Sequence, residues 1–267
     1  MRSSVPARGG IWMTRIETAP AISGHLTIRP CESHDDLKLC VELQRRIWGF
    51  GGEDVTPAAI FVVAQHTGGH AYCAFDGARA IGFALAFLSG HDGRTAWRSH
   101  MVGVLPEYQN RGVGRLLKLY QRDQALRTGI QTIEWTFDPL ELRNAHFNIS
   151  RLGAIVRQCI PNCYGGSTSP LHGALPTDRL LAEWRLRSDR VEAALAGATV
   201  RRAGPEAIEV PVPAGIRELR ESEGARAREI QTDLRRRFTD LFSRGYAVTG
   251  FRRGNITCEY VLEPYED

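Results

Sequence analysis

The stretch that decides the fold is VGVLPEYQNRGVGRLLK, residues 102–118. Residues 102–104 predict the end of an apolar strand, and Pro106 stops that strand because proline has no N–H for the sheet ladder. Gly112 and Gly114 then mark a short loop, and apolar residues at helical spacing follow it. A strand, a glycine loop and a helix N-terminus in this order leave backbone N–H groups free to bind an anion, and the helix dipole adds positive potential. The sequence therefore predicts a phosphate-binding turn.

Three kinds of anion site share this layout. A mononucleotide P-loop requires Lys and then Ser or Thr after the last glycine, where this chain has Arg115 and Leu116. A dinucleotide fingerprint requires a third glycine, and this chain has Leu117 at that position. Glu134, about twenty residues further on, does match the acidic residue of that motif. The third kind fits best, because V-x-P followed by Q-x-x-G-x-G over residues 104–114 resembles the pyrophosphate-binding motif of the GNAT family of acyl-CoA-dependent N-acyltransferases.

The elements expected around this loop follow the order of that family. Hydrophobic patterns and turn residues predict strands at 25–29, 71–75, 79–88, 95–104, 132–137, 154–160 and 180–186, and helices at 35–48, 57–65, 113–127 and 138–152. The three strands before the loop form an antiparallel meander rather than βαβ units, which argues against the dinucleotide interpretation. The resemblance implies the GNAT fold, an α/β (α+β) fold whose mixed, mostly antiparallel sheet carries helices on both faces.

The resemblance divides the chain into three parts. Residues 1–24 are expected to form a disordered tail, and residues 25–187 to form the acyltransferase domain. Residues 188–267 are expected to be a C-terminal α/β extension, packed on that domain. Within the extension the sequence predicts a strand at 208–212, a long helix at 219–242, and a hairpin of strands 246–251 and 256–262.

Composition excludes several classes of protein. A net charge of +4 is too small to indicate nucleic-acid binding, and no run of eighteen apolar residues predicts a membrane span. The N-terminus has no apolar segment typical of a signal peptide, so a cytoplasmic protein is expected. The six cysteines predict buried free thiols and no metal site, because Cys159 and Cys163 have no second pair of ligands nearby.

The resemblance implies an acyl-CoA, acetyl-CoA by default, as co-substrate. Its diphosphate would lie on the loop amides, and its pantetheine arm would pair with the edge of the preceding strand, which in the family splays from the next strand. The residues expected to bind it are Met101, Val102, Gly103, Val104, Gln109, Asn110, Arg111, Gly112, Val113, Gly114 and Arg115, joined by Asn144 and Asn148. The last two are spaced i,i+4 and are expected to share one helix face.

Direct attack of an amine on a thioester leaves two protons to be moved. His100, on the strand that enters the loop, and Glu134, on the following strand, are the candidate bases. Many family members carry a tyrosine in the next helix that donates a proton to the leaving thiolate, but this chain has Ile149 at that position. Tyr164 is the nearest replacement in the sequence.

The expected activity is transfer of an acetyl or other short acyl group from CoA to a primary amine of a small molecule, with an amino acid as one plausible acceptor. Two alternatives stay open: a protein N-terminal or lysine acetyltransferase, and a catalytically weak acyl-CoA-binding or interaction module. No nucleic-acid or membrane partner is expected, and the sequence is compatible with a monomer or a homodimer.

Overall fold

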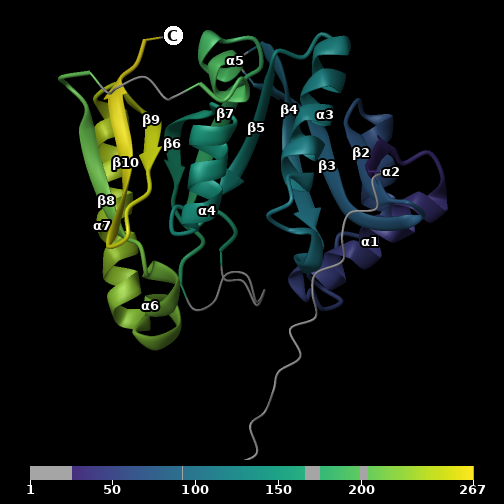
Figure 1. Ribbon diagram of the computed structural model, residues 1–267, viewed down its shortest axis with the longest axis horizontal. Helices are drawn as coiled ribbons and strands as arrows, with labels where there is room; N and C mark the ends of the chain where they lie inside the picture. Colours follow the sequence, from purple (N-terminus) through teal and green to yellow (C-terminus); the bar gives the residue numbers. More distant parts are fainter. Residues whose placement is uncertain (1–25, 92, 166–174, 199–203, 267) are drawn as a thin grey trace, which may run out of the picture.

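One sheet runs through the part of the chain that the computed structural model describes, which is residues 26–91, 93–165, 175–198 and 204–266. Its strands are β1 Leu26–Pro30, β2 His70–Asp76, β3 Arg79–His91, β4 Arg94–Val104, β5 Thr132–Phe137, β6 Ile155–Ile160, β7 Arg179–Arg185, β8 Ile208–Pro213, β9 Tyr246–Arg252 and β10 Thr257–Pro264. The ten strands lie in the order β1-β2-β3-β4-β5-β7-β6-β9-β10-β8 (Figure 1). The pair β4–β5 is parallel and the other pairs are antiparallel.

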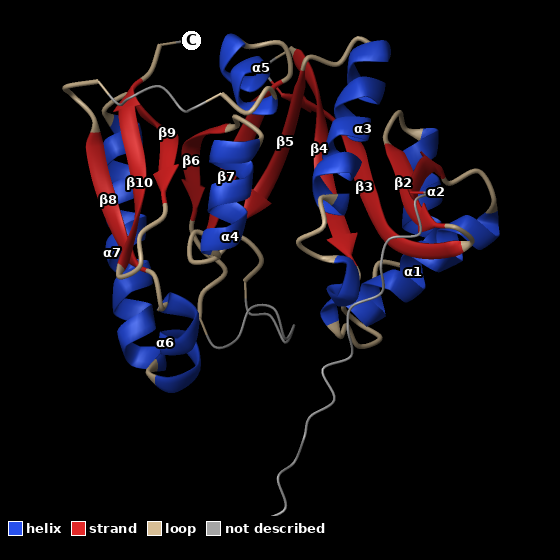
Figure 2. Ribbon diagram, in the orientation of Figure 1, coloured by secondary structure: helices blue, strands red, loops and turns tan. Residues whose placement is uncertain are grey.

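Helices lie on both faces of this sheet, as Figure 2 shows. They are α1 His34–Trp48, α2 Ala58–His66, α3 Val113–Arg127, α4 Leu142–Ala145, α5 Asp189–Leu195, α6 Ile216–Ser222 and α7 Gly224–Ser243, with a 3-10 turn η1 Pro106–Tyr108 and a π-helical segment η2 His146–Arg151. The predicted fold class, a mixed and mostly antiparallel sheet with helices on both faces, is confirmed.

Helix α1 begins and ends at residues whose chemistry fixes it. Ser33 Oγ accepts a hydrogen bond from the Asp36 N–H at 3.1 Å, and the Asp36 carboxylate accepts one from the Ser33 N–H at 3.2 Å. This reciprocal capping box satisfies two N–H groups at the helix start. Gly49 ends the helix with a φ of 68°, a left-handed conformation that glycine adopts without a steric penalty.

Neighbouring residues at the end of β4 show which helix covers which face. A Cβ on Gly103 would lie 2.9 Å from Ile47 Cδ1 and 3.0 Å from Trp48 Cζ2, so α1 packs directly on the strand backbone. Val104 points to the opposite face, because successive side chains of a strand alternate. There its Cγ2 lies 3.9 Å from the Cβ position of Gly114 in α3. Helix α1, with α2 packed beside it, therefore covers one face, and α3 covers the other.

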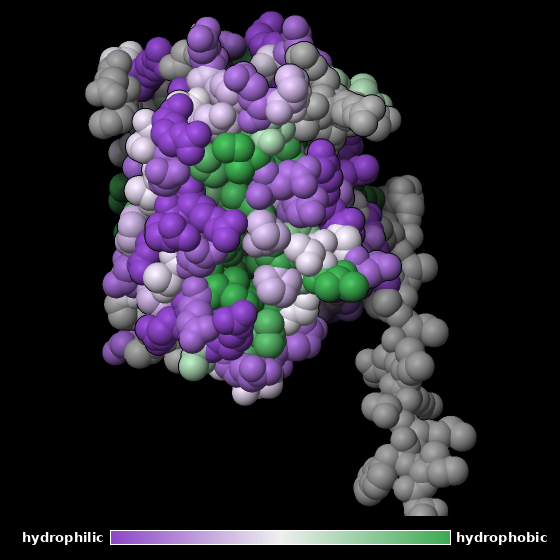
Figure 3. All heavy atoms as spheres, turned by 90° about the vertical axis from the view of Figure 1, so that its left-hand side faces the viewer, coloured by the Kyte–Doolittle hydropathy of each residue, from purple (hydrophilic) through white to green (hydrophobic). Residues whose placement is uncertain are grey.

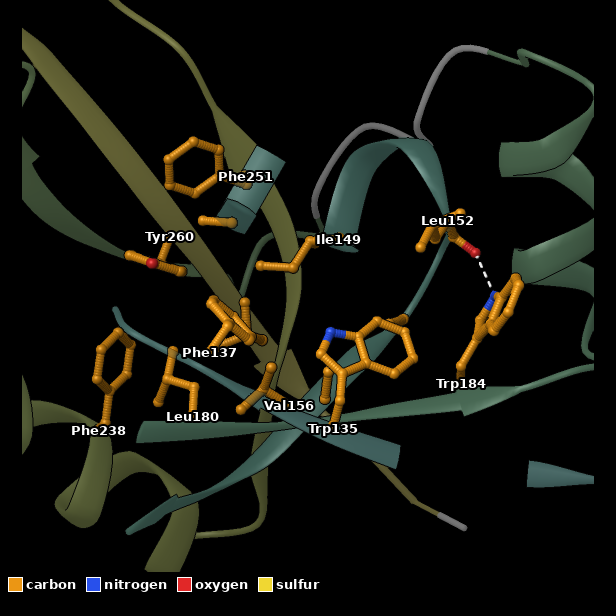
Figure 4. Packing of buried hydrophobic residues seen from close by; sticks show 14 of the residues in the cluster. Trp135, Phe137, Ile149, Leu152, Val156, Leu180, Trp184, Phe238, Phe251 and Tyr260 are labelled. Atoms are coloured by element: carbon orange, nitrogen blue, oxygen red, sulfur yellow. Dashed lines mark hydrogen bonds between the residues drawn. The ribbon is translucent and has the colours of Figure 1, made fainter. Parts of the chain in front are cut away.

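Two hydrophobic cores lie on either side of the β4–β5 junction. The first packs α1, α2 and α3 against β2, β3 and β4. The second joins β5, β6 and β7 to the C-terminal elements β8, β9, β10 and α7. In Figure 4, Trp135 and Trp184 lie in the same cluster as Phe238 of α7 and Tyr260 of β10, and the Trp184 indole N–H donates to the Leu152 carbonyl at 2.7 Å. The second core therefore includes both the predicted domain and the predicted extension.

Three elements differ from the prediction. The helix expected at 138–152 is a short α4 followed by the π-helical η2. The helix expected at 219–242 is divided into α6 and α7 at Glu223, whose φ of −136° and ψ of 61° are not helical. Helix α5 was not predicted. The expected tail at 1–24 lies outside the described residues, as does the segment 166–174 of the loop between β6 and β7.

The C-terminal end of the sheet is an edge strand, β8. Pro211 and Pro213 remove N–H donors from this strand, which blunts an edge that would otherwise pair with another chain. Figure 3 shows this end of the molecule, where hydrophilic side chains predominate and hydrophobic ones show between them. None of the helices described combines the length and the apolar character needed to cross a lipid bilayer.

Candidate functional site

The predicted anion loop connects β4 to α3 through η1. Two residues in it have positive φ, Asn110 at 60° and Gly112 at 84°, and together they reverse the chain so that α3 starts beside the end of β4. Gly112 is the N-cap of α3 and has no side chain to cap the helix. The backbone N–H groups in the first turn of α3 therefore need acceptors from outside the helix.

The backbone N–H groups of this turn are available. Within the described part of the chain, Gly112, Val113, Gly114 and Arg115 donate to no protein carbonyl, and the first N–H bound inside the turn is that of Leu116, to the Gly112 carbonyl at 3.0 Å. A Cβ at Gly112 would meet nothing within 4 Å, so the space above the turn is open. Free amides at a helix N-terminus with open space before them form a site for a phosphate group.

The side chains of the loop hold its shape. Gln109 Nε2 donates to the Val104 carbonyl at 3.0 Å and so ties the loop to the end of β4. The Arg111 guanidinium lies 5.7 Å from the centre of the Tyr108 ring. Arg115 donates to the Leu195 carbonyl at the end of α5, at 2.8 Å. Gln109 and Arg115, both predicted to bind the cofactor, therefore use their side chains within the protein, and their contribution to an anion site is through position and charge.

Strand β4 carries a bulge next to this site. Met101 is paired with Leu85 and Ser99 with Ala86, so His100 is an extra residue without a partner across the strand. The Leu105 N–H, two residues beyond Gly103, donates to β3, at the Ile81 carbonyl.

Alternation along the strand then gives the direction of the other amides. Because successive residues direct their N–H groups to opposite edges, Met101 and Gly103 face β3, whereas Val102 and Val104 face β5. Of the four strand residues predicted to bind the cofactor, two thus present their backbone to the edge on the β5 side. The Gln109 bond to the Val104 carbonyl agrees with this direction.

The two parallel strands part soon after they meet. Their register contains Trp97 with Ile133 and Arg98 with Glu134, although β4 continues to Val104 and β5 to Phe137. Figure 1 shows β4 and β5 diverging from this junction. The edge of β4 that carries the Val102 and Val104 backbone is consequently not paired with β5, and an extended chain can pair with it.

All three predicted catalytic residues lie on the face of the sheet opposite α3. His100 packs edge-on against Phe87, with ring centres 5.6 Å apart. Glu134 lies between the inward-facing Ile133 and Trp135, and its carboxylate is 3.7 Å from the Arg98 guanidinium. The Tyr164 hydroxyl lies 2.9 Å from Thr136 Oγ1, which places it on β5, two residues beyond Glu134 along the strand.

The surroundings of these residues differ in charge. Desolvation by the surrounding protein, aided by Arg98, lowers the pKa of the exposed His100 imidazole below its usual 6.5. The imidazole is therefore neutral at neutral pH and can accept a proton. The Glu134 carboxylate is instead held in an ion pair with Arg98. The Arg179 guanidinium lies 5.3 Å from the centre of the Tyr164 ring, and it is itself buried 3.9 Å from Asp138.

The two predicted asparagines lie in different environments. Asn144 is in α4 and exposed, whereas Asn148 is in η2 and buried. Asn144 and Asn148 were expected to share one face of an α-helix, but the wider turn of the π-helical segment changes their relative direction. Ile149, at the family's tyrosine position, is buried in the core with 1% of its surface exposed.

Sequence reasoning missed a buried polar cluster at the point where β4 and β5 part. Lys118 Nζ on α3 lies 3.1 Å from Ser99 Oγ, 3.2 Å from Gln121 Oε1 and 3.5 Å from the centre of the Trp135 ring. Burial lowers the pKa of Lys118 well below 10.5. Gln121 continues the cluster to His70, 3.3 Å away. The sequence did offer a signal for this cluster: Lys118 is one of only two lysines in the chain, and it follows the apolar Leu117 in the helix.

Comparisons with known proteins agree with this geometry. Residues 37–153 match the family model described as Acetyltransferase (GNAT) family. Among curated proteins, none matches the chain. The crystal structure of the ribosomal-protein-S18-alanine N-acetyltransferase from Escherichia coli is similar, with a TM-score of 0.50, 18% identity, and coverage of 61% of this chain and 96% of that chain.

Two further solved structures are similar. Arabidopsis thaliana Naa50 in complex with the bisubstrate analogue CoA-Ac-MVNAL has a TM-score of 0.47 at 14% identity, covering 59% of this chain and 97% of that one. Arabidopsis thaliana NAA60 in complex with a bisubstrate analogue has a TM-score of 0.48 at 15% identity, covering 60% and 97%. The family match, the fold shared with the Escherichia coli enzyme and the uncapped loop together identify the chain: it carries, over residues 37–153, an acetyltransferase domain of the GNAT family.

Proposed function

We propose that this protein transfers an acetyl group from acetyl-CoA to a primary amine of a small molecule. The observation that carries the proposal is the turn at residues 112–115, whose N–H groups have no acceptor among the described residues and lie beside the unpaired edge of β4. A diphosphate bound there would direct an extended thioester arm along that edge. Other short acyl-CoAs, such as succinyl-CoA, fit the same argument.

The strand edge supplies the next contacts. Val104 and Val102 present backbone groups to an arm that carries amides, as a sheet edge does to a peptide. The Val102 N–H, which follows the bulge, is the donor that we assign to the thioester oxygen as it gains negative charge. One such preorganised donor is worth roughly 10²–10³ in rate.

We assign the base to His100. The amine attacks the thioester carbon, a C–N bond forms, the C–S bond breaks, and the amine proton passes to the imidazole. His100 is preferred to Glu134 because its lowered pKa keeps it neutral at neutral pH, whereas Glu134 is paired with Arg98. We assign Tyr164 as the donor to the leaving thiolate, from the same face of the sheet.

The acceptor is tested by turnover. The full chain is incubated with acetyl-CoA and a panel of amines, which contains amino acids, polyamines, aminosugars and peptides with free N-termini, and the release of CoA thiol is followed. The proposal expects release with a small-molecule amine. Release of CoA thiol with peptides alone would show a protein acetyltransferase instead. If none of the amines caused release, the protein would be a binding module.

Binding is tested separately by glycine variants. Gly114→Ala adds a methyl group beside the free amides of the turn, where it makes only ordinary contact with the protein, 3.9 Å from Val104 Cγ2. We expect an unchanged melting temperature and at least about tenfold weaker binding of acetyl-CoA, equivalent to about 1.4 kcal/mol. Gly224→Ala, at the start of α7 with nothing within 4 Å, is the matched control. NAD in place of acetyl-CoA should give no thermal shift.

A further inference from the structure

Three cysteines that are distant in sequence meet in the N-terminal core. Cys31 follows β1, Cys40 lies in α1 and Cys73 lies in β2. Cys40 Sγ is 3.6 Å from Cys31 Sγ and 3.4 Å from Cys73 Sγ, and all three sulfurs lie within 4.8 Å of one another. Their exposed fractions are 2%, 0% and 0%. Three separate elements thus direct one thiol each to a common point.

The spacing of these sulfurs matches a set of metal ligands. Zinc–sulfur bonds of about 2.3 Å place neighbouring thiolates of a tetrahedral site about 3.8 Å apart. A disulfide would require one pair to approach to about 2.05 Å, much shorter than either contact here. Within the described residues the group contains no histidine or carboxylate, so the ligand set is three sulfurs. Thiolates select soft ions over magnesium or calcium.

The start of α1 offsets part of the charge that three thiolates would bring, and an ion pair lies next to the cluster. Arg29 stands opposite Cys73 in the β1–β2 register and donates to the Asp36 carboxylate, with contacts of 2.7 and 2.9 Å. Cys31 lies just before Ser33, the N-cap of α1, where the helix dipole favours negative charge.

We propose that Cys31, Cys40 and Cys73 form a binding site for one thiophilic metal ion, of the class of Zn(II), Cd(II) and Cu(I). Binding breaks three S–H bonds and forms three metal–sulfur bonds, and the three protons leave to the solvent without any oxidation or reduction. The ion fixes α1 to β1 and β2. The last residues of α1 pack on Gly103 of β4, so the same ion also steadies the strand that borders the acyl-CoA site.

The test uses the full chain, reduced and free of metal. Titration with Cd(II) and Cu(I) is followed by the ultraviolet thiolate-to-metal absorption, and X-ray absorption of the Zn(II) form counts the sulfur neighbours. We expect one equivalent to bind, three sulfurs at about 2.3 Å around zinc, and a higher melting temperature.

Variants assign the ligands. Cys31→Ser, Cys40→Ser and Cys73→Ser should each lose the third sulfur and bind at least tenfold more weakly. Cys258→Ser, which removes a buried thiol from the other core, should bind like the wild type. The absence of a bound ion in the wild type, or equal loss in Cys258→Ser, would overturn the proposal. The sulfur count on the wild type decides the question even where a variant fails to fold.

Discussion

At the scale of single residues, the junction of β4 and β5 contains a cluster of buried polar side chains. Lys118 contacts Ser99, Gln121 and the Trp135 ring, and burial lowers its pKa. Lys118 donates to Ser99 of β4 and lies over the Trp135 ring of β5, so one side chain joins the two strands inside the core. This arrangement fixes the point at which the strands part.

His70 makes the stability of this cluster depend on pH. Burial, and then Lys118, lower the pKa of His70 from 6.5 to about 3. Below pH 6.5 the unfolded chain binds a proton that the folded chain does not, so the free energy of unfolding falls as the pH drops from 6.5 toward 3. We expect His70 to account for a loss of roughly 2 kcal/mol between pH 7 and pH 5.

Denaturant unfolding at the two pH values measures this loss. In His70→Gln the decrease between pH 7 and pH 5 should be smaller by about that amount, while Lys118 stays in both proteins and its effect cancels. Equal decreases in the two proteins would show that His70 is not buried in its neutral form.

The pH dependence of turnover tests the proposed role of His100 as the base. Its lowered pKa places the acidic limb of kcat/KM below pH 6.5, because activity appears once the imidazole loses its proton. We expect His100→Gln to lose that limb and about 10²–10⁴ of the rate, with unchanged affinity for acetyl-CoA. If the limb persists in His100→Gln and disappears in Glu134→Gln, the base is Glu134.

At the scale of elements, helix α7 supports the loop between β6 and β7. Gln231 Nε2 donates to the Pro176 carbonyl at 2.8 Å, and the Arg235 guanidinium lies 3.5 Å from the buried Asp178 carboxylate. Tyr164, in the same loop, reaches β5 through Thr136. Helix α7 thus holds the loop that carries Tyr164, on the face of the sheet where we place the attack of the amine.

Replacement of Gln231 tests this support. Gln231→Leu removes the bond to Pro176, so we expect the KM for the amine to rise several-fold and the stability to fall by about 1–2 kcal/mol. Binding of acetyl-CoA should not change. Thr232→Ala is the control, because among the described residues the Thr232 hydroxyl donates to a carbonyl of its own helix, that of Arg228. The KM for the amine is measured by steady-state kinetics at varied amine concentration. The same KM in Gln231→Leu and Thr232→Ala would contradict the account.

Element boundaries show where sequence patterns suffice. The strands were predicted to within a few residues, since turn residues such as Asp76-Gly77 bound them. Helix α1 was predicted from its cap at Ser33. The π-helical turn of η2 was missed, because apolar spacing does not distinguish it from an α-helix over six residues. The division between α6 and α7 was missed because one helix was predicted from 219 to 242, straight through Gly224.

At the scale of the whole molecule, the sheet does not stop at the predicted boundary after residue 187. Strand β9 joins β6 through the pair Val156 and Val248, and Tyr260 donates to the Pro139 carbonyl at 2.7 Å. Phe238 of α7 lies in the same core as Leu180 of β7. The extension therefore covers apolar surface that residues 25–187 would otherwise expose.

Truncation tests whether the predicted domain can stand alone. We expect a chain that ends at Arg187 to lose cooperative unfolding and to aggregate, because half of its second core is missing. The full chain should give a single calorimetric transition. A truncated chain that unfolds cooperatively and binds acetyl-CoA would contradict this account and support the boundary at 187.

For the candidate site, the sequence predicts local features of the chain but not contacts between distant segments. The loop and its amides follow from local chain geometry, which the glycine spacing around Gly112 encodes. Contacts between distant segments carry no such signal: Tyr164 meets Thr136, and Cys31 meets Cys73, because strands that are distant in sequence pair in the sheet. The parting of β4 and β5 was expected from the family resemblance and not from the residues themselves.

The most direct measurement is a crystal structure of the full chain with CoA. The account predicts diphosphate oxygens within about 3 Å of the N–H groups of residues 112–115, and the pantetheine arm paired with β4 at Val102 and Val104. A CoA molecule bound elsewhere, or β4 and β5 joined by hydrogen bonds along their whole length, would contradict it.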